Sequence, residues 1–159
     1  MPVLALMEAA ALLPARGALI GLDLGTKTIG VAVSDPDRRL ATSVETVARK
    51  RFTLDAARLL ELASERRAVG FVLGLPINMD GTESKQTQKI RDFAGKLAGR
   101  LNVPMFFVDE RLTSKQAERM MRESGVKAKN QRGKVDQVAA ALLLESALKG
   151  APLTEVPKP

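Results

Sequence analysis

The sequence predicts an α/β fold with a mixed five-stranded sheet flanked by helices. The first observation is a series of three β-type segments separated by turn residues, which indicates an antiparallel meander. The second is the alternation of helical periodicity with short apolar runs in the rest of the chain. Since parallel strands are joined through helical crossovers, this alternation adds parallel strands to the meander.

The meander is predicted within residues 18–48. Residues 18–24, ALIGLDL, and residues 28–34, TIGVAVS, are rich in apolar and β-branched side chains, and the GTK between them ends the first strand. The stretch DPDRR at 35–39 has turn chemistry, because its proline fixes a backbone angle and its aspartates bond nearby backbone groups. Residues 40–48, LATSVETVA, then supply a third strand.

The middle of the chain alternates between two helices and two strands. Residues 54–68 repeat apolar side chains at helical spacing. The run VGFVLGL at 69–75 is typical of a strand buried on both faces, and Pro76 ends it. Residues 90–101 return to the helical spacing, and VPMFFVDE at 103–110 follows as the fifth strand.

The last third of the chain is predicted to contain two helices. TSKQ at 113–116 has the spacing of a capping box and predicts a helix that ends near Ser124. We expect residues 125–134, which are polar and basic, to be mobile, and residues 135–149 to form the last helix. Residues 150–159 contain three prolines and are predicted to be disordered.

The length favours a single domain. The chain has 159 residues, 45% of them apolar, which is enough for one core and too few for two full domains. We place this domain at residues 17–149, after an N-terminal arm or helix at residues 1–16. That first segment contains Glu8, lacks a basic start and is too short to span a membrane. We therefore expect no secretory signal, no membrane partner and a cytoplasmic location.

The composition restricts the chemistry. Lys and Arg outnumber Asp and Glu by 25 to 18, which gives a net charge of +7 and makes polyanions the natural partners. The chain has no Cys and no His. This excludes disulfides, thiolate or imidazole zinc sites and Ser-His triads. Catalysis must use carboxylates, lysines, hydroxyls or a bound cation.

Three acidic positions stand near the ends of predicted elements. They are Asp23 in the first strand, the pair Asp109 and Glu110 at the end of the fifth, and Asp136 at the start of the last helix. Burying an unpaired charge costs several kcal/mol or more, so Asp23 requires a partner. A set of oxygen ligands selects Mg²⁺ or Mn²⁺, and two such ions about 4 Å apart would clamp a phosphodiester. Strand alternation alone does not choose between Asp109 and Glu110.

Polar and basic residues near these acids are candidates for binding a nucleic-acid backbone. A turn beside the first acid, a loop after the fourth strand and a basic segment before the last helix offer amides, hydroxyls and cations to phosphates. With five Phe and neither Tyr nor Trp, we expect recognition of backbone and shape more than of base sequence. The candidates are Thr26, Lys27, Asn78, Arg111, Lys127, Lys129, Arg132 and Lys134.

Each of these features also has a purely structural interpretation. Asp23 can cap the glycine turn that follows it, and Glu110 can form a surface ion pair with Arg111. Asp136 suits the first turn of any helix, because the helix dipole favours an acidic residue there. The turn, the loop and the basic segment can be ordinary solvated connections. Arg111 can be a solvated charge.

Four motifs together resemble a known family. GLDLGTKTIGVAVSD, GLPINMDGTES, VDERLTS and VDQVAAALLLESAL, in this order and spacing, resemble the YqgF family, described as Holliday junction resolvases and as nucleases of pre-16S rRNA. The resemblance covers about residues 17–149. It implies a ribonuclease H-like fold with Asp23, Glu110 and Asp136 as the metal-binding acids. It therefore favours Glu110 over Asp109.

The resemblance implies a Mg²⁺- or Mn²⁺-dependent nuclease that processes the 5′ end of precursor 16S rRNA, with Holliday junction cleavage as the alternative. The first motif is also similar to the phosphate-binding hairpin of sugar kinases and actin-like ATPases, which need a second domain that this chain has no room for. A third hypothesis is a non-catalytic RNA-binding factor in ribosome assembly or transcription. Whether the chain is a monomer or a weak homodimer is left open.

Overall fold

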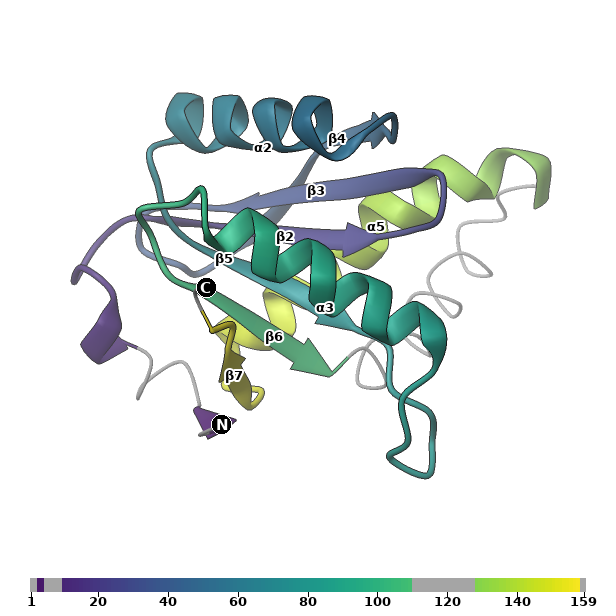
Figure 1. Cartoon of the computed structure of the whole chain (residues 1–159). Coiled ribbons are helices and arrows are strands. Elements are labelled where there is room, and N and C mark those ends of the chain that lie inside the picture. The colour runs from purple at the N-terminus through teal and green to yellow at the C-terminus, as the bar shows by residue number, and fades with distance from the viewer. Residues whose placement is uncertain (1–2, 5–9, 110–127, 158–159) are drawn as a thin grey trace.

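The protein is built on one sheet with helices on both faces (Figure 1). The computed structural model describes residues 3–4, 10–109 and 128–157, and the side chains of residues 11–109 and 138–157. The sheet has seven strands in the order β1-β7-β6-β5-β2-β3-β4. The elements are β1 (Val3–Leu4), η1 (Ala10–Leu12), β2 (Ala18–Leu24), β3 (Thr28–Ser34), β4 (Ala41–Ala48), α2 (Phe52–Arg66), β5 (Ala68–Leu75), α3 (Lys85–Ala98), β6 (Met105–Asp109), α5 (Ala128–Leu148) and β7 (Leu153–Glu155).

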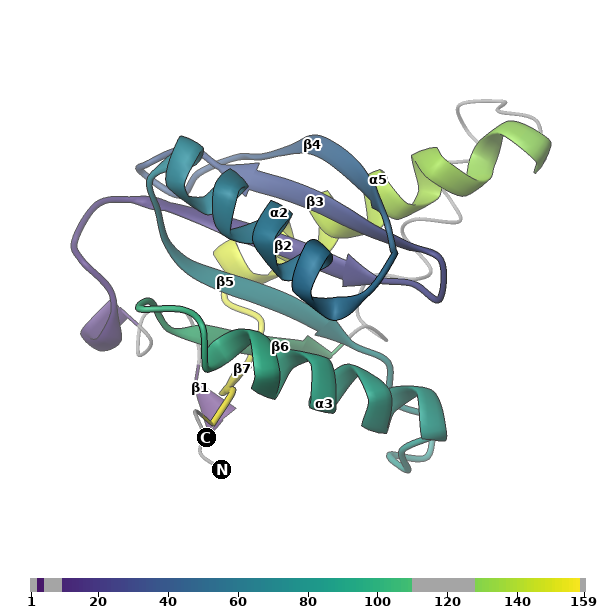
Figure 2. The ribbon, with the colours of Figure 1, turned by 45° about the horizontal axis from the view of Figure 1, so that its top comes forward.

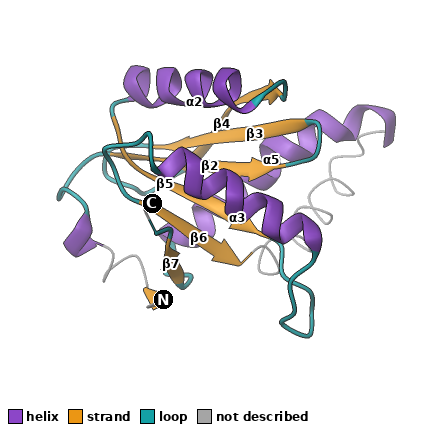
Figure 3. Ribbon diagram, viewed as in Figure 1, coloured by secondary structure: helices purple, strands orange, loops and turns teal. Residues whose placement is uncertain are grey.

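The predicted meander and the predicted parallel strands are both confirmed. Strands β2, β3 and β4 pair antiparallel in sequence order, while β2 with β5 and β5 with β6 pair parallel. The helices α2 and α3 connect β4 to β5 and β5 to β6 (Figure 3). The mixed α/β class therefore follows the local signals of the sequence, and the parallel strands lie at the centre of the sheet.

The core divides into two layers, one on each face of the sheet. Residues such as Leu22 and Phe71 pack with α2 and α3 in one layer. Residues such as Leu19 and Phe106 pack with α5 in the other layer. Figure 2 shows α2 and α3 on the same side of the strands, with α5 behind them. Among the helices of the described residues, none is long and apolar enough to cross a membrane.

The tail prediction is wrong for residues 153–155, and this accounts for much of the difference between five and seven strands. Strand β7 pairs antiparallel with β6 on one side and with β1 on the other. Leu153 is 0% exposed and Val156 is 3% exposed, so the tail contributes to the core. Proline has no backbone N–H to donate, so it is found beside strands more readily than inside them. Pro152 directly precedes β7, and Pro157 lies two residues after it.

The last helix is longer than predicted. Helix α5 begins at Ala128, so residues 128–134, which we expected to be mobile, are helical. Five of these seven residues are Ala, Lys, Gln or Arg, which have good helix propensity, and Asn130 and Gly133, which have poor propensity, do not break the helix. The helix predicted to start at Thr113 and residues 125–127 lie outside the described residues.

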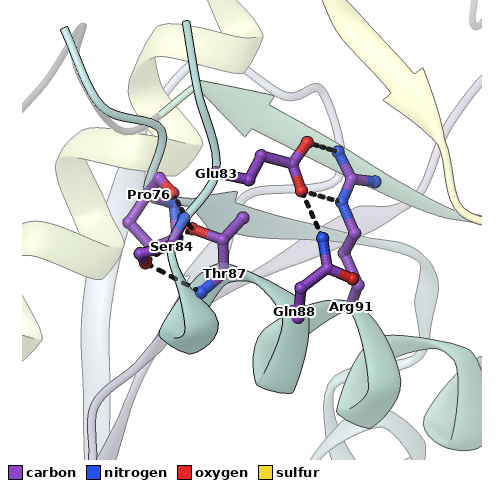
Figure 4. A network of polar contacts seen from close by, with 6 residues as sticks. All are labelled: Pro76, Glu83, Ser84, Thr87, Gln88 and Arg91. Carbon is purple, nitrogen blue, oxygen red and sulfur yellow. Dashed lines mark hydrogen bonds and ion pairs between the residues drawn. The ribbon is translucent and has the colours of Figure 1, made fainter.

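Helix α3 is tied to the end of β5 at its N-terminus (Figure 4). Ser84 is the N-cap, and its hydroxyl accepts a hydrogen bond of 3.2 Å from the backbone N–H of Thr87. The Thr87 side chain is fully buried; its hydroxyl accepts from the Ser84 backbone N–H and donates to the carbonyl of Pro76. The two residues thus form a capping box that also orients α3 against the sheet.

Thr87→Val is expected to lower the free energy of unfolding by roughly 1–2 kcal/mol, because it leaves a carbonyl and an N–H without their hydroxyl partner. Thr87→Ser keeps the hydroxyl and should cost clearly less. Urea unfolding of both variants checks this. Equal losses would show that the missing methyl or the altered packing, and not the hydroxyl, determines the stability of this junction.

Candidate active site

The candidate residues that the structure describes lie at one edge of the sheet. Because β2, β5 and β6 are parallel neighbours, their C-terminal ends lie at the same edge. The turn between β2 and β3, the loop at residues 76–84 and the N-terminal part of α5 lie at this edge as well (Figure 1). In α/β sheets ligands bind at the carboxyl ends of the strands, so this edge is the place to search for an active site.

Asp23 stands at this edge on the face covered by α5. It is the penultimate residue of β2 and is half-buried. Side chains alternate along a strand, and Leu19, four residues earlier, packs in the α5 layer. Its partner across the β2–β3 ladder is Gly30, which places no side chain over it. The side chain of Asp23 therefore projects toward α5 at this edge of the sheet.

Helix α5 approaches β2 very closely beside Asp23. A Cβ atom on Gly21 would lie 2.9 Å from the Leu144 Cβ and 3.0 Å from the Ala140 carbonyl oxygen. Only glycine permits this contact without displacing the helix. Asp136 precedes Ala140 by four residues in α5, one helical turn nearer the N-terminus. The side chain of Asp136 is outside those that the structure describes.

Asp109 stands at the same edge but belongs to the opposite face. Met105 and Phe107 pack in the layer of α2 and α3, whereas Phe106 and Val108 pack in the layer of α5. By alternation Asp109 projects with Met105 and Phe107, away from the face of Asp23. The structure thus places Asp109 on the face of the sheet opposite to Asp23. Glu110 itself lies outside the described residues.

The turn after β2 is held from the side of β4. The Gly25 N–H donates to the Thr28 carbonyl at 2.8 Å. The Arg49 backbone N–H donates to the Lys27 carbonyl at 2.9 Å, and its guanidinium Nη1 donates to the Gly25 carbonyl at 2.7 Å. The side chains of Thr26 and Lys27 are exposed. Both predicted phosphate contacts therefore stand on a turn whose backbone is fixed.

A cavity of about 350 Å³ opens beside this turn. It lies between the turn, the segment that joins β4 to α2, and the first turns of α3. Its cationic residues were not singled out in the sequence, where the only signal was a run of basic residues, RKR at 49–51, directly after the third strand. The cavity is lined by Leu24, Gly25, Thr26, Arg49, Lys50, Gln86, Lys89 and Ile90.

The loop after β5 has its own hydrogen-bond network. The Asn78 side-chain amide donates to the Thr82 hydroxyl at 2.9 Å, and the Thr82 backbone N–H donates to Asp80 at 3.0 Å. Gly81 adopts a positive φ of 89°, which closes the turn. The amide of Asn78, predicted to contact phosphate, thus has a structural role within the loop.

An ion pair joins the end of this loop to α3 (Figure 4). The Arg91 Nε and Nη2 donate to the two carboxylate oxygens of Glu83 at 2.7 and 2.6 Å. These hydrogen bonds lower the pKa of the Glu83 carboxyl below its ordinary value of 4.5, against a smaller opposing effect of partial burial. The pair fixes the loop to the helix and neutralises Arg91.

This ion pair predicts an acid-sensitive contribution to stability. Because the folded protein has the lower pKa at Glu83, the contribution is complete above pH 4.5 and is lost as the pH falls through the lowered value. Glu83→Gln should flatten the loss of thermal stability below pH 4.5. Asp92→Asn, which removes an exposed carboxylate of the same helix, should behave like the parent. An unchanged pH profile for Glu83→Gln would contradict the assignment.

The remaining predicted residues are distributed between α5 and the undescribed segment. Glu110, Arg111 and Lys127 lie outside the described residues. Four residues, with side chains that are also undescribed, lie on α5, and they are Lys129, Arg132, Lys134 and Asp136. Among the side chains that the structure describes, no group of three acidic residues could hold a metal ion.

Comparison with known proteins decides the family. A family model described as "RuvX: Holliday junction resolvase" matches residues 17–150. The chain belongs to the RuvX family. The match spans the meander, the parallel strands and α5, and it confirms the resemblance noted in the sequence.

RuvX relatives include curated proteins that share most of their length with this chain. A Bradyrhizobium sp. (strain ORS 278) protein named "Putative pre-16S rRNA nuclease" is 56% identical over 147 residues, which are 92% of this chain and 91% of that protein. A Nitrobacter winogradskyi protein of the same name is 57% identical over 146 residues, 92% and 90% of the two chains.

Solved structures of resolvases share the fold of this RuvX chain. T. thermophilus RuvC in complex with a Holliday junction substrate aligns with a TM-score of 0.56 and 18% identity, over 86% of this chain and 99% of that one. A second Thermus thermophilus RuvC structure aligns with a TM-score of 0.54 and 16% identity, over 85% and 99%. At such identity the likeness shows the fold alone, and that fold is the predicted ribonuclease H-like one.

Proposed function

We propose that this RuvX-family chain is a metal-dependent nuclease that hydrolyses phosphodiesters of structured nucleic acid, acting on the 5′ end of precursor 16S rRNA. The observation that supports this most strongly is the 56% identity, over 92% of the chain, to a relative named as a pre-16S rRNA nuclease. The net charge of +7 agrees with a polyanionic substrate.

The metal ligands in this proposal are Asp23, Glu110 and Asp136. The position of Asp23 on the α5 face supports its role, and the projection of Asp109 to the other face favours its neighbour Glu110. Asp136 stands one helical turn before Ala140, whose carbonyl lies close to Gly21 on the same face as Asp23. Three elements that are distant in the sequence would thus contribute one carboxylate each.

The chemistry of this donor set fits a hard cation. With neither His nor Cys in the chain, any metal must be held by oxygen atoms, which favours Mg²⁺ or Mn²⁺. When bound, such an ion supplies Lewis-acid polarisation of the phosphodiester and activation of water. The acidic side chains hold and orient the ion, and their own negative charge is balanced by it.

The basic and polar residues around the edge hold the substrate in this proposal. Thr26 and Lys27 stand exposed on the fixed turn beside Asp23, where a hydroxyl and an ammonium can bind a phosphate oxygen. Arg111 follows Glu110 directly in the sequence and is assigned to the same phosphate group. A basic row assigned to steering the nucleic-acid backbone toward the acids consists of Lys127, Lys129, Arg132 and Lys134.

A second candidate function is cleavage of four-way DNA junctions. The description of the family as a Holliday junction resolvase favours it. The two candidates share the site and the chemistry and differ in the nucleic acid that the surface accepts. The 56% identity to a relative named as a pre-16S rRNA nuclease is the reason for proposing the RNA substrate first.

The test is cleavage by the purified full chain of two labelled substrates, a precursor 16S rRNA fragment with its 5′ leader and a four-way DNA junction. Each is incubated with Mn²⁺, with Mg²⁺ and with chelator. We expect cleavage near the mature 5′ end of the rRNA that the chelator abolishes. Cleavage of the junction alone would select the second candidate. Binding of the RNA without any metal-dependent cleavage would instead indicate a non-catalytic RNA-binding factor.

A further inference from the structure

The cavity beside the β2–β3 turn has the composition of a phosphate-binding site. It brings together three cations from two separate parts of the chain, Arg49 and Lys50 after β4 and Lys89 on α3. Gln86 adds a side-chain amide as a hydrogen-bond donor. Of the described residues that line the cavity, none is acidic. This combination attracts an anion. The oxygen atoms of a phosphate have several lone pairs and can accept hydrogen bonds from these donors.

Arg49 is held in place before any ligand binds. Its Nη1 donates to the Gly25 carbonyl at 2.7 Å, and the guanidinium carbon lies 5.4 Å from the centre of the Phe93 ring, within cation–π range. A guanidinium has five N–H donors, so this anchoring leaves others for a ligand. A cation fixed in this way loses little conformational entropy when it binds an anion.

The lysines of the cavity lack the neutralising partners of nearby arginines. Arg91 is paired with Glu83, and Arg58 is paired with Glu45. Within residues 11–109 and 138–157, by contrast, no carboxylate forms an ion pair with the side chain of Lys50 or Lys89. The cavity therefore keeps its positive charge available to a ligand.

The cavity opens near the proposed catalytic acid but on the other face of the sheet. Leu24 and Ile90, which line the cavity, belong to the core layer of α2 and α3. Thr26 is only three residues from Asp23, so their Cα atoms are at most about 10 Å apart. A strand bound in the cavity can therefore reach the acid within a few nucleotides.

We propose that this cavity binds a backbone phosphate of the substrate strand, a few nucleotides from the bond that is cut. A strand held there passes around the β2–β3 turn, with one phosphate at Arg49, Lys50 and Lys89 and the scissile phosphate on the α5 side at Asp23. The inference rests on the proposed function. It adds a second binding site on the strand, which sets the distance between the phosphate in the cavity and the scissile phosphate.

The test compares Lys50→Gln/Lys89→Gln with a control, Arg39→Gln/Arg66→Gln, that removes two exposed cations at the far end of the sheet. Binding of labelled precursor 16S rRNA is measured by fluorescence anisotropy at several salt concentrations, with chelator present to prevent cleavage. We expect the slope of log K against log salt to decrease in magnitude by about 1 in the cavity variant. The control should keep the slope of the parent.

A second measurement locates the phosphate. Single phosphates within four nucleotides of the cut are replaced one at a time by uncharged methylphosphonates. One replacement should weaken binding to the parent and have no further effect on the cavity variant. The cavity is not a phosphate site if the parent binds and cuts RNA but the parent and the cavity variant have equal salt slopes. The same conclusion follows if no methylphosphonate position weakens binding to the parent more than binding to the cavity variant. If the folded parent binds no nucleic acid at all, the proposed function fails as well.

Discussion

Asp23→Asn is expected to lower metal-dependent cleavage by at least about 10³-fold, the loss of several kcal/mol of metal-assisted stabilisation of the transition state. The amide keeps the size of the carboxylate but removes the negative charge that holds a divalent cation. The residue is half-buried near the end of β2, so the variant should still fold. Single-turnover cleavage of the preferred substrate in Mn²⁺, together with a thermal melt, measures both effects.

Asp109→Asn is the matched control for this prediction. Asp109 ends β6, a parallel strand separated from β2 by β5, at the same edge of the sheet. The substitution is chemically identical, but the Asp109 side chain projects toward the layer of α2 and α3. We expect this variant to keep most of the parental activity. Equal loss in the two variants would contradict the division of the edge into an α5 face and an opposite face. Full activity in Asp23→Asn would remove the catalytic assignment altogether.

Gly21→Ala is expected to destabilise the protein by about 1–3 kcal/mol, the usual cost of overpacking a close contact. The added methyl group would lie 2.9 Å from the Leu144 Cβ and 3.0 Å from a backbone oxygen, so α5 must move away from β2. Because α5 carries Asp136, cleavage should fall together with stability. Urea unfolding and the rate of cleavage at saturating metal measure the two effects.

Gly95→Ala provides a control with the same chemical change and the opposite sign. Gly95 lies within α3, and a Cβ there would meet nothing within 4 Å. Alanine is preferred to glycine in a helix, so this variant should be stabilised by about 0.5–1 kcal/mol and keep its activity. If both glycine variants changed stability in the same direction, the close packing of α5 on β2 would not be the cause.

The central strands could be predicted from sequence because their signals are local. The run at 69–75 is apolar on both faces and ends at a proline, and the strand it predicts is observed at Ala68–Leu75. Strand β7 has no such signal, because its stability comes from pairing with β6, which is more than forty residues earlier in the chain. From sequence, its three residues are therefore predicted to be part of a disordered, proline-rich tail.

In the candidate site, too, local signals in the sequence predict some residues, while others depend on how the elements pack. Asp23 is conspicuous in sequence because a charge interrupts an apolar strand. The choice between Asp109 and Glu110 was not accessible, because MFFV before them is apolar on both faces and gives no polar alternation to read. Only the positions of the helices identify the two faces. The cavity beside the turn was missed for a related reason, since α3 brings Lys89 to the basic residues after β4.

The pairing of β7 with β6 has a consequence for the synthesis of the protein. The outer hydrogen-bonding edge of β6 is covered by Leu153–Glu155, which follow β6 by more than forty residues. A nascent chain can assemble the meander and the parallel strands earlier, yet it carries an open sheet border until residues 153–155 have been synthesised. Closure of this side of the sheet therefore comes later than formation of its central strands.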